Sequence, residues 1–181
     1  MVKIPFLFAE SVFAAVWVLC RAAVWFRQKR IDWKREALLL LMYVNLAVLL
    51  RLTFFPLALV KGHVPPLRFN AAAILPFRTD LVPFARLLKY RRRSTLLHMA
   101  ENILMFIPSG ILLPFLYRRL DRFWKAVGVG ALMSLGIELA QLLLSTRMTD
   151  VNDLIMNTLG AAVGYGLYAL MRALAKRASR G

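Results

Sequence analysis

The sequence predicts an all-α fold, a polytopic membrane helix bundle of about five transmembrane helices. Of the 181 residues, 60% are hydrophobic, and the mean hydropathy is +0.62. Apolar runs of about 20 residues recur along the chain, and each can cross a hydrocarbon core of about 30 Å at about 1.5 Å per residue. Basic residues gather between these runs, as they do beside membrane spans. These observations exclude an ordinary soluble domain, and we expect residues 1–181 to form a single membrane domain.

Five spans are expected, at residues 4–26, 37–57, 96–117, 124–145 and 152–171. A secretory signal peptide is the alternative for the first span. However, Glu10 and Arg21 interrupt its apolar run, and the basic stretch RQKR follows the run. A signal peptide has its basic residues before the apolar run, so we expect an uncleaved helix.

Residues 58–95 form a long connection between the second and third spans that is both apolar and basic. Its apolar pieces, NAAAILPF at 70–77 and LVPFARLLKY at 81–90, are too short to cross the membrane. We expect a re-entrant or interfacial segment, broken at Pro76, whose basic side chains reach lipid phosphates. A solvated basic loop is the alternative.

The basic residues also predict the orientation of the chain in the cell membrane. They crowd residues 27–35, 118–125 and 172–180, whereas the amino terminus and the 146–152 loop carry only Lys3 and Arg147. The positive-inside rule then places the N-terminus outside and the C-terminus in the cytoplasm, although the basic 58–95 connection conflicts with this rule. Since the charge of +16 mostly flanks spans, we expect no nucleic-acid partner.

Two of the expected spans carry polar or small residues at helical spacing. The first set is Ser134, Glu138, Gln141 and Ser145, and the second is Asp153, Asn157, Gly160 and Gly164. Steps of three and four residues place each set on one helix face. An ionised carboxylate within a bilayer costs roughly 2.5 to 3.5 kcal/mol on insertion scales, so it faces protein or water. These two faces are the strongest pointer to function.

Several polar residues of different spans are expected at a similar depth. Counting about 1.5 Å per residue from the expected outer ends places them roughly 6 to 10 Å deep. They are Glu10, Arg51, Asn102, Glu138, Gln141 and Asn157. We expect one pocket in which the Arg51 guanidinium neutralises Glu138 or Glu10. Alternatively, the amides and serines only join helices, at about 0.6 kcal/mol for each hydrogen bond, and Asp153 only caps a helix.

Other local features have simpler interpretations. Gly160 and Gly164 form a GxxxG motif, expected to pack most simply against the 124–145 span, with homodimerisation as the alternative. His98 shares a helix face with Asn102 and is expected to be an interfacial hydrogen-bonding residue rather than a metal ligand. The single cysteine, Cys20, excludes an intramolecular disulfide and a CxxC pair. We expect no metal and no cofactor.

The second half of the chain carries a combination of short motifs. They are NILMFIPSG at 102–110, Glu138-Leu-Ala-Gln141, Arg147, Asp150-Val-Asn-Asp153 and Asn157-Thr-Leu-Gly160. This combination resembles the VanZ-like family of small bacterial membrane proteins. The resemblance extends over about residues 51–168, and we expect the family's core domain at about residues 40–170. Leu75-Pro-Phe-Arg78 is similar to another family element. One departure is Ser109, where the family usually has an aromatic residue.

The resemblance implies a cell-envelope protein of the bacterial cytoplasmic membrane. The family takes its name from an accessory protein that lowers susceptibility to the glycopeptide teicoplanin. The residues expected to bind are Arg51, Asn102, Glu138, Gln141, Arg147, Asp153 and Asn157. Our first hypothesis is a noncatalytic protein whose pocket binds a lipid-like or lipid-linked ligand. Membrane lipids, including anionic lipids and lipid-linked envelope precursors, would then be its partners.

Two alternatives remain open. In the first, an intramembrane enzyme uses Glu138 and Asp153 as acid and base, with Arg51 or Arg147 holding a phosphate or carboxylate. In the second, the protein is a small proton-coupled carrier in which buried acidic residues relay the protons. The sequence has no Ser-His-Asp series, two-histidine metal motif or glycine-rich nucleotide loop, so we favour the noncatalytic hypothesis.

Overall fold

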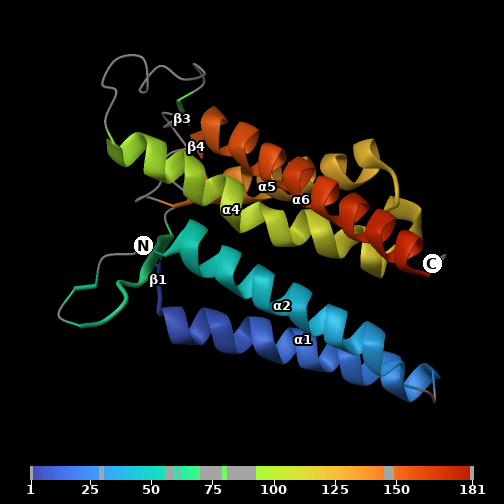
Figure 1. The fold of residues 1–181 in the computed structure, drawn as a ribbon. Coiled ribbons are helices and arrows are strands. Elements are labelled where there is room, and N and C mark those ends of the chain that lie inside the picture. Colours follow the sequence, from blue (N-terminus) through green and yellow to red (C-terminus); the bar gives the residue numbers. More distant parts are fainter. Residues whose placement is uncertain are drawn as a thin grey trace. The chain divides into compact units, whose positions relative to one another are not determined.

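The computed structural model describes residues 2–28, 31–55, 59–60, 62–69, 79–80, 93–144 and 149–179. In these ranges five helices are long and apolar enough to cross a membrane (Figure 1). They are α1 (Phe6–Gln28), α2 (Trp33–Phe54), α4 (Arg93–Leu116), α5 (Phe123–Gln141) and α6 (Val151–Ala178). The prediction of an all-α fold with five spanning helices is therefore confirmed. Most of the 58–95 connection, including 70–78 and 81–92, lies outside the described residues.

The helices differ from the expected spans by a few residues at their ends. α2 begins at Trp33 rather than residue 37 because Asp32 caps it, with Oδ1 accepting the N–H of Lys34 at 3.1 Å and of Arg35 at 3.2 Å. α6 continues seven residues past the expected end, to Ala178. Hydropathy marks the part of a helix that suits the lipid, whereas hydrogen bonding marks the whole helix.

The chain forms two compact units. The first unit comprises Met1–Arg78 and Ala140–Met148. Its helices α1 and α2 lie side by side, joined by an ion pair between Arg21 and Glu36 (Figure 1). The Tyr43 ring stacks on Phe13 at a centroid distance of 5.3 Å and lies 4.9 Å from the Trp17 ring. Arg21, which interrupts the first apolar run, is thus paired with a carboxylate of the next helix.

A short antiparallel ladder completes the first unit. β1 (Val2–Ile4) pairs with β2 (Leu67–Phe69), and Lys3 lies opposite Arg68. Ahead of β2 the chain turns at Gly62, whose φ of 76° lies in the left-handed region that favours glycine. The sequence analysis did not predict this ladder, because strands of three residues are too short for a hydrophobic pattern.

The second unit comprises Thr79–Leu139 and Thr149–Gly181, and its α4 and α6 pack side by side. Glycines make this contact close. A Cβ added at Gly160 would overlap the Ile103 carbonyl, and one added at Gly164 would overlap the Ile107 carbonyl. The GxxxG motif therefore does serve packing, but the expected partner was wrong. The motif contacts α4 rather than the helix at 124–145, because glycines admit the backbone of whichever helix approaches closest.

At the other end of the second unit, η2 (Arg118–Leu120) connects α4 to α5. Asp121 follows it and accepts a hydrogen bond from the Tyr168 hydroxyl at 3.1 Å, and it also pairs with Arg172. The Tyr168 ring contacts the rings of Phe115 and Tyr165, and Tyr165 contacts the Phe123 ring in turn. This aromatic and ionic contact holds the α4–α5 connection against α6.

Candidate functional site

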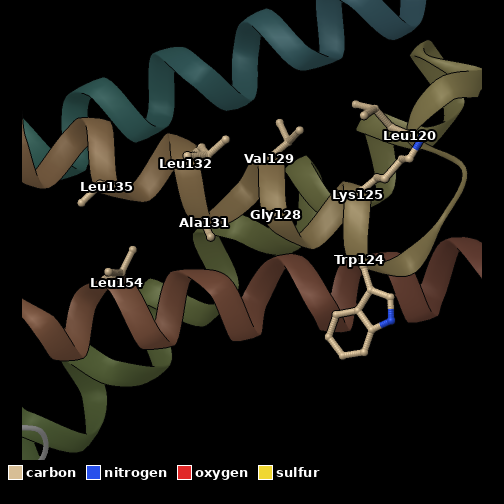
Figure 2. Close-up of a pocket in the computed structure, with 9 residues that line it drawn as sticks. All are labelled: Leu120, Trp124, Lys125, Gly128, Val129, Ala131, Leu132, Leu135 and Leu154. Carbon is tan, nitrogen blue, oxygen red and sulfur yellow. The ribbon is translucent and has the colours of Figure 1, made fainter.

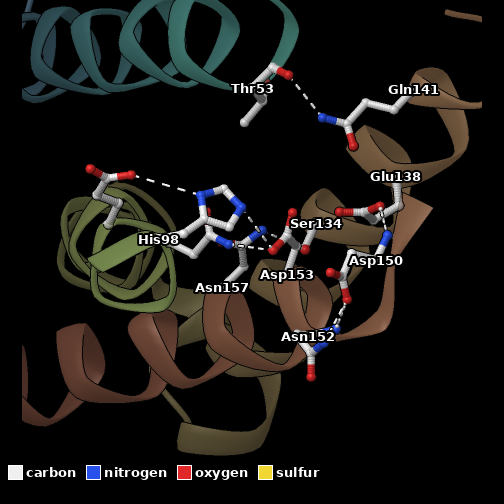
Figure 3. Close-up of polar contacts among 11 residues, drawn as sticks. Thr53, His98, Ser134, Glu138, Gln141, Asp150, Asn152, Asp153 and Asn157 are labelled. Atoms are coloured by element: carbon white, nitrogen blue, oxygen red, sulfur yellow. Dashed lines mark hydrogen bonds and ion pairs between the residues drawn. The ribbon is translucent and has the colours of Figure 1, made fainter. Parts of the chain in front are cut away.

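A cluster of polar side chains lies where α4 and α6 begin and α5 ends, within the second unit (Figure 3). Each helix contributes two residues that are four positions apart, which places both on one helix face. The pairs are His98 and Asn102 on α4, Ser134 and Glu138 on α5, and Asp153 and Asn157 on α6. We call these six residues the polar cluster.

The Asp153 carboxylate is held by α4. The Asn102 side-chain amide donates a hydrogen bond to Asp153 Oδ1 at 2.6 Å, and Asn102 is buried. His98 Nε2 lies 3.4 Å from the same oxygen, and its Nδ1 lies 3.7 Å from a Glu101 carboxylate oxygen. The His98 side chain is 56% exposed and that of Asp153 is 19% exposed. The polar cluster is therefore accessible along this edge.

A second contact of the polar cluster joins α5 to α6. The Asn157 amide nitrogen donates to Ser134 Oγ at 2.9 Å, and both residues are buried. Asn157 Oδ1 is buried and has no hydrogen-bond partner among the described residues. An unsatisfied buried acceptor costs about 1 to 3 kcal/mol. Asn157 thus provides an open acceptor position in the polar cluster.

Glu138 takes part in the cap of α6. Asp150 is the N-cap residue, and its Oδ1 accepts the backbone N–H of Asn152 at 2.8 Å. The backbone N–H of Asp150 donates in turn to Glu138 Oε2 at 3.0 Å. In an ordinary capping box, the acid three residues into the helix would accept that N–H. Here the residue at that position is Asp153, but its carboxylate is turned toward α4. The buried Glu138 accepts the Asp150 N–H in its place.

Part of the long connection also reaches the start of α6. β3 (Thr79–Asp80) pairs in parallel with β4 (Thr149–Asp150), and Asp80 lies opposite Asp150. Thr79 and Asp80 are therefore paired beside the helix cap that Glu138 supports. The sequence analysis missed this pairing, since a ladder of two residues has no detectable periodicity.

Two of the predicted binding residues belong to the first unit, and a third lies outside the described residues. Gln141 belongs to the first unit, is buried and donates to the Thr53 carbonyl at 2.8 Å. Arg51 is also in the first unit, where its guanidinium donates to the Phe55 carbonyl at 3.3 Å and lies 5.3 Å from the Phe6 ring centroid. Arg147 lies outside the described residues. The pairing of Arg51 with Glu138 or Glu10 remains a prediction.

The structure brings four of the seven predicted binding residues into the polar cluster: Asn102, Glu138, Asp153 and Asn157. His98 was not predicted as a site residue, although its four-residue spacing from Asn102 was the available signal. The N-cap of α6 is Asp150 rather than Asp153, the residue for which a capping role was the alternative interpretation. Among the described residues no group of three or more His, Cys, Asp or Glu side chains could hold a metal ion.

The five spanning helices and the buried polar cluster define a polytopic helical membrane protein. A family model described as VanZ/LLP1 matches residues 38–172, which is most of the chain, and the chain belongs to this family. The chain is also 29% identical over 107 residues to Protein VanZ of Enterococcus faecium. That match covers 58% of the chain and 62% of the relative, so the chain spans less than two thirds of the relative's length. No solved structure gives a significant match.

Proposed function

We propose that this VanZ-family protein binds a lipid-like or lipid-linked ligand of the bacterial cell envelope in its polar cluster. The supporting observation is that three helices each contribute two polar side chains to this cluster, and that Asn157 Oδ1 is a buried acceptor with no hydrogen-bond partner among the described residues. Polar groups that only join membrane helices need no partly exposed carboxylate such as that of Asp153, and buried acceptors are nearly always paired. A ligand that donates hydrogen bonds would satisfy both features.

The chemistry of the polar cluster favours a ligand headgroup rich in donors. Glu138 and Asp153 supply carboxylate oxygens, and Asn157 supplies an amide oxygen. Hydroxyl, amide and amino groups are the donors that such acceptors prefer, and a charged partner strengthens each bond. The exposed edge formed by His98 and Asp153 would admit the headgroup, while the ligand's apolar part stays in lipid.

We propose that the polar cluster lies in the outer half of the cytoplasmic membrane, with the N-terminus outside and the C-terminus in the cytoplasm. The basic residues at the far end of the second unit support this orientation. They follow α4 or occupy the last turns of α6, and they are Arg118, Arg119, Arg122, Lys176 and Arg177. Basic residues favour the cytoplasmic side, which leaves the polar cluster outside.

This placement is compatible with a role against lipoglycopeptides such as teicoplanin, which carries an acyl chain and acts at the outer surface. We propose that the protein lowers susceptibility to such compounds through altered access to the membrane or to a lipid-linked target. The family membership supports this proposal.

Glu138→Gln tests the proposal in cells. The amide oxygen of glutamine still accepts the Asp150 N–H, so the cap of α6 is kept while the carboxylate is removed. We expect Glu138→Gln to return teicoplanin susceptibility and surface-bound teicoplanin to the levels of cells without the protein. Asp121→Asn is the matched control, because it makes the same chemical change at the far end of the second unit. Full resistance with normal expression of Glu138→Gln would reject the proposal.

One contact favours an intramembrane enzyme as the second candidate. His98 Nε2 lies 3.4 Å from Asp153 Oδ1, which is how an acid orients a histidine base. In that case purified protein would convert a component of a lipid extract, and the product would disappear both in Glu138→Gln and in His98→Gln. Binding without turnover would support the noncatalytic proposal.

A further inference from the structure

An apolar groove runs along α5 in the second unit, and none of the described residues that line it belongs to the polar cluster (Figure 2). Its volume is about 590 Å³, and Trp124, Gly128, Ala131 and Leu135 line it at steps of four, three and four residues. These steps place the four residues on one helix face. Leu154 of α6 lines the end next to Leu135.

The groove is hollow because two small residues stand between two large ones. Gly128 and Ala131 separate Trp124 from Leu135 along the helix face. A Cβ added at Gly128 would meet no heavy atom within 4 Å. A larger side chain at this position would therefore occupy the groove without displacing the backbone.

The end of the groove near the α4–α5 connection is cationic. Lys125 is the charged residue among those that line it, and beside it Trp124 is 81% exposed. Arg118, Arg119 and Arg122 precede Lys125 in the chain and are exposed. The acid within this stretch, Asp121, already pairs with Arg172 and Tyr168. An exposed tryptophan beside basic residues is typical of the membrane–water interface.

The length of the groove matches one leaflet. From Trp124 to Leu135 the helix rises about 16 Å at about 1.5 Å per residue, which is about half of a 30 Å hydrocarbon core. We propose that the groove binds one acyl chain of an anionic phospholipid, whose phosphate is held by Lys125. In the proposed orientation this lipid belongs to the cytoplasmic leaflet, so the site is separate from the ligand site in the polar cluster.

Native mass spectrometry of the full chain in detergent tests the site. Phosphatidylglycerol and phosphatidylcholine with identical acyl chains would be titrated separately. We expect phosphatidylglycerol to bind more tightly by roughly fivefold, the ratio expected from one basic residue near an anionic headgroup. In Lys125→Gln this preference disappears, while Lys176→Gln at the end of α6 keeps it. Equal binding of the two lipids to the unchanged protein, or an unchanged preference in Lys125→Gln, would overturn the proposal.

Gly128→Leu tests the acyl-chain part of the proposal. The leucine fills the groove, so we expect both lipids to bind roughly fivefold more weakly through the loss of van der Waals contacts. Gly136→Leu is the control, since a Cβ there also meets no heavy atom within 4 Å and Gly136 does not line the groove. Both variants should keep the unfolding temperature of the unchanged protein. Lipid binding by Gly128→Leu equal to that of Gly136→Leu would show that the groove holds no acyl chain.

Discussion

Asp153 and Glu138 are two carboxylates that perform different tasks at the start of α6. Asp153 occupies the position that normally closes a capping box, yet its carboxylate accepts a hydrogen bond from Asn102. Glu138 accepts the N–H that Asp153 leaves free. The cap of α6 is thus completed by another helix, and Asp153 becomes available to the polar cluster.

The Asn102–Asp153 contact can be measured with a double-mutant cycle. We expect Asn102→Ala and Asp153→Ala to be coupled by about 0.6 kcal/mol and up to about 1.7 kcal/mol, the range found for hydrogen bonds between membrane helices. The measurement is the free energy of unfolding of the two single variants and the double variant in micelles.

A matched cycle pairs Asn102→Ala with Asp121→Ala. Asp121 lies at the far end of the second unit and bonds to Tyr168 instead. Sites that share no partner should show a coupling within about 0.5 kcal/mol of zero. Similar coupling in both cycles would mean that the Asn102–Asp153 hydrogen bond does not contribute to stability.

Among the helices, α4 and α6 make the closest contact, and it depends on glycine. A Cβ at Gly110 would overlap the Ala161 carbonyl, and one at Gly164 would overlap the Ile107 carbonyl. Ser109, where the family usually has an aromatic residue, is buried beside this contact. Small residues at these positions let the two backbones approach, which aligns His98 and Asn102 with Asp153.

Gly164→Ala tests this contact. The added methyl group has to displace backbone atoms of α4, so we expect a loss of about 1 to 3 kcal/mol in the free energy of unfolding. Gly166→Ala is the control on the same helix, where a Cβ meets nothing within 4 Å. Alanine favours a helix over glycine by about 1 kcal/mol, so Gly166→Ala should be neutral or slightly stabilising. A control as damaging as Gly164→Ala would contradict the packing argument.

For the molecule as a whole, orientation determines whether the polar cluster faces the outer leaflet. Single cysteines placed at Lys3 and at Ser179 in a Cys20→Ser background report on opposite ends of the chain. We expect a membrane-impermeant maleimide to label Lys3→Cys on intact cells and Ser179→Cys only after permeabilisation. The reverse pattern would place the polar cluster in the cytoplasmic half and would also reassign the leaflet of the groove.

Much of the fold could be predicted because membrane spans are encoded locally. Apolar run length predicted all five helices, and only their ends differed, as at Asp32 and Ala178. The four-residue spacing also placed Glu138 and Asp153 on the faces that they use. The partner of the GxxxG motif, the exchange of roles at the α6 cap and the strand beside Asp150 could not be predicted, because each depends on residues far apart in the chain.

The length of an apolar run and the spacing of polar residues along a helix are properties of neighbouring residues in the chain. The sequence alone therefore determined the membrane class, the number of spans and the polar face of each helix. Family membership likewise rests on residues along the chain, over 38–172. Contacts between helices depend on where backbones can approach, and Gly160 and Gly164 allow that approach toward α4. The tertiary structure was needed to bring Asn102 to Asp153 and Ser134 to Asn157, because a hydrogen bond forms only when packing places donor and acceptor within about 3 Å.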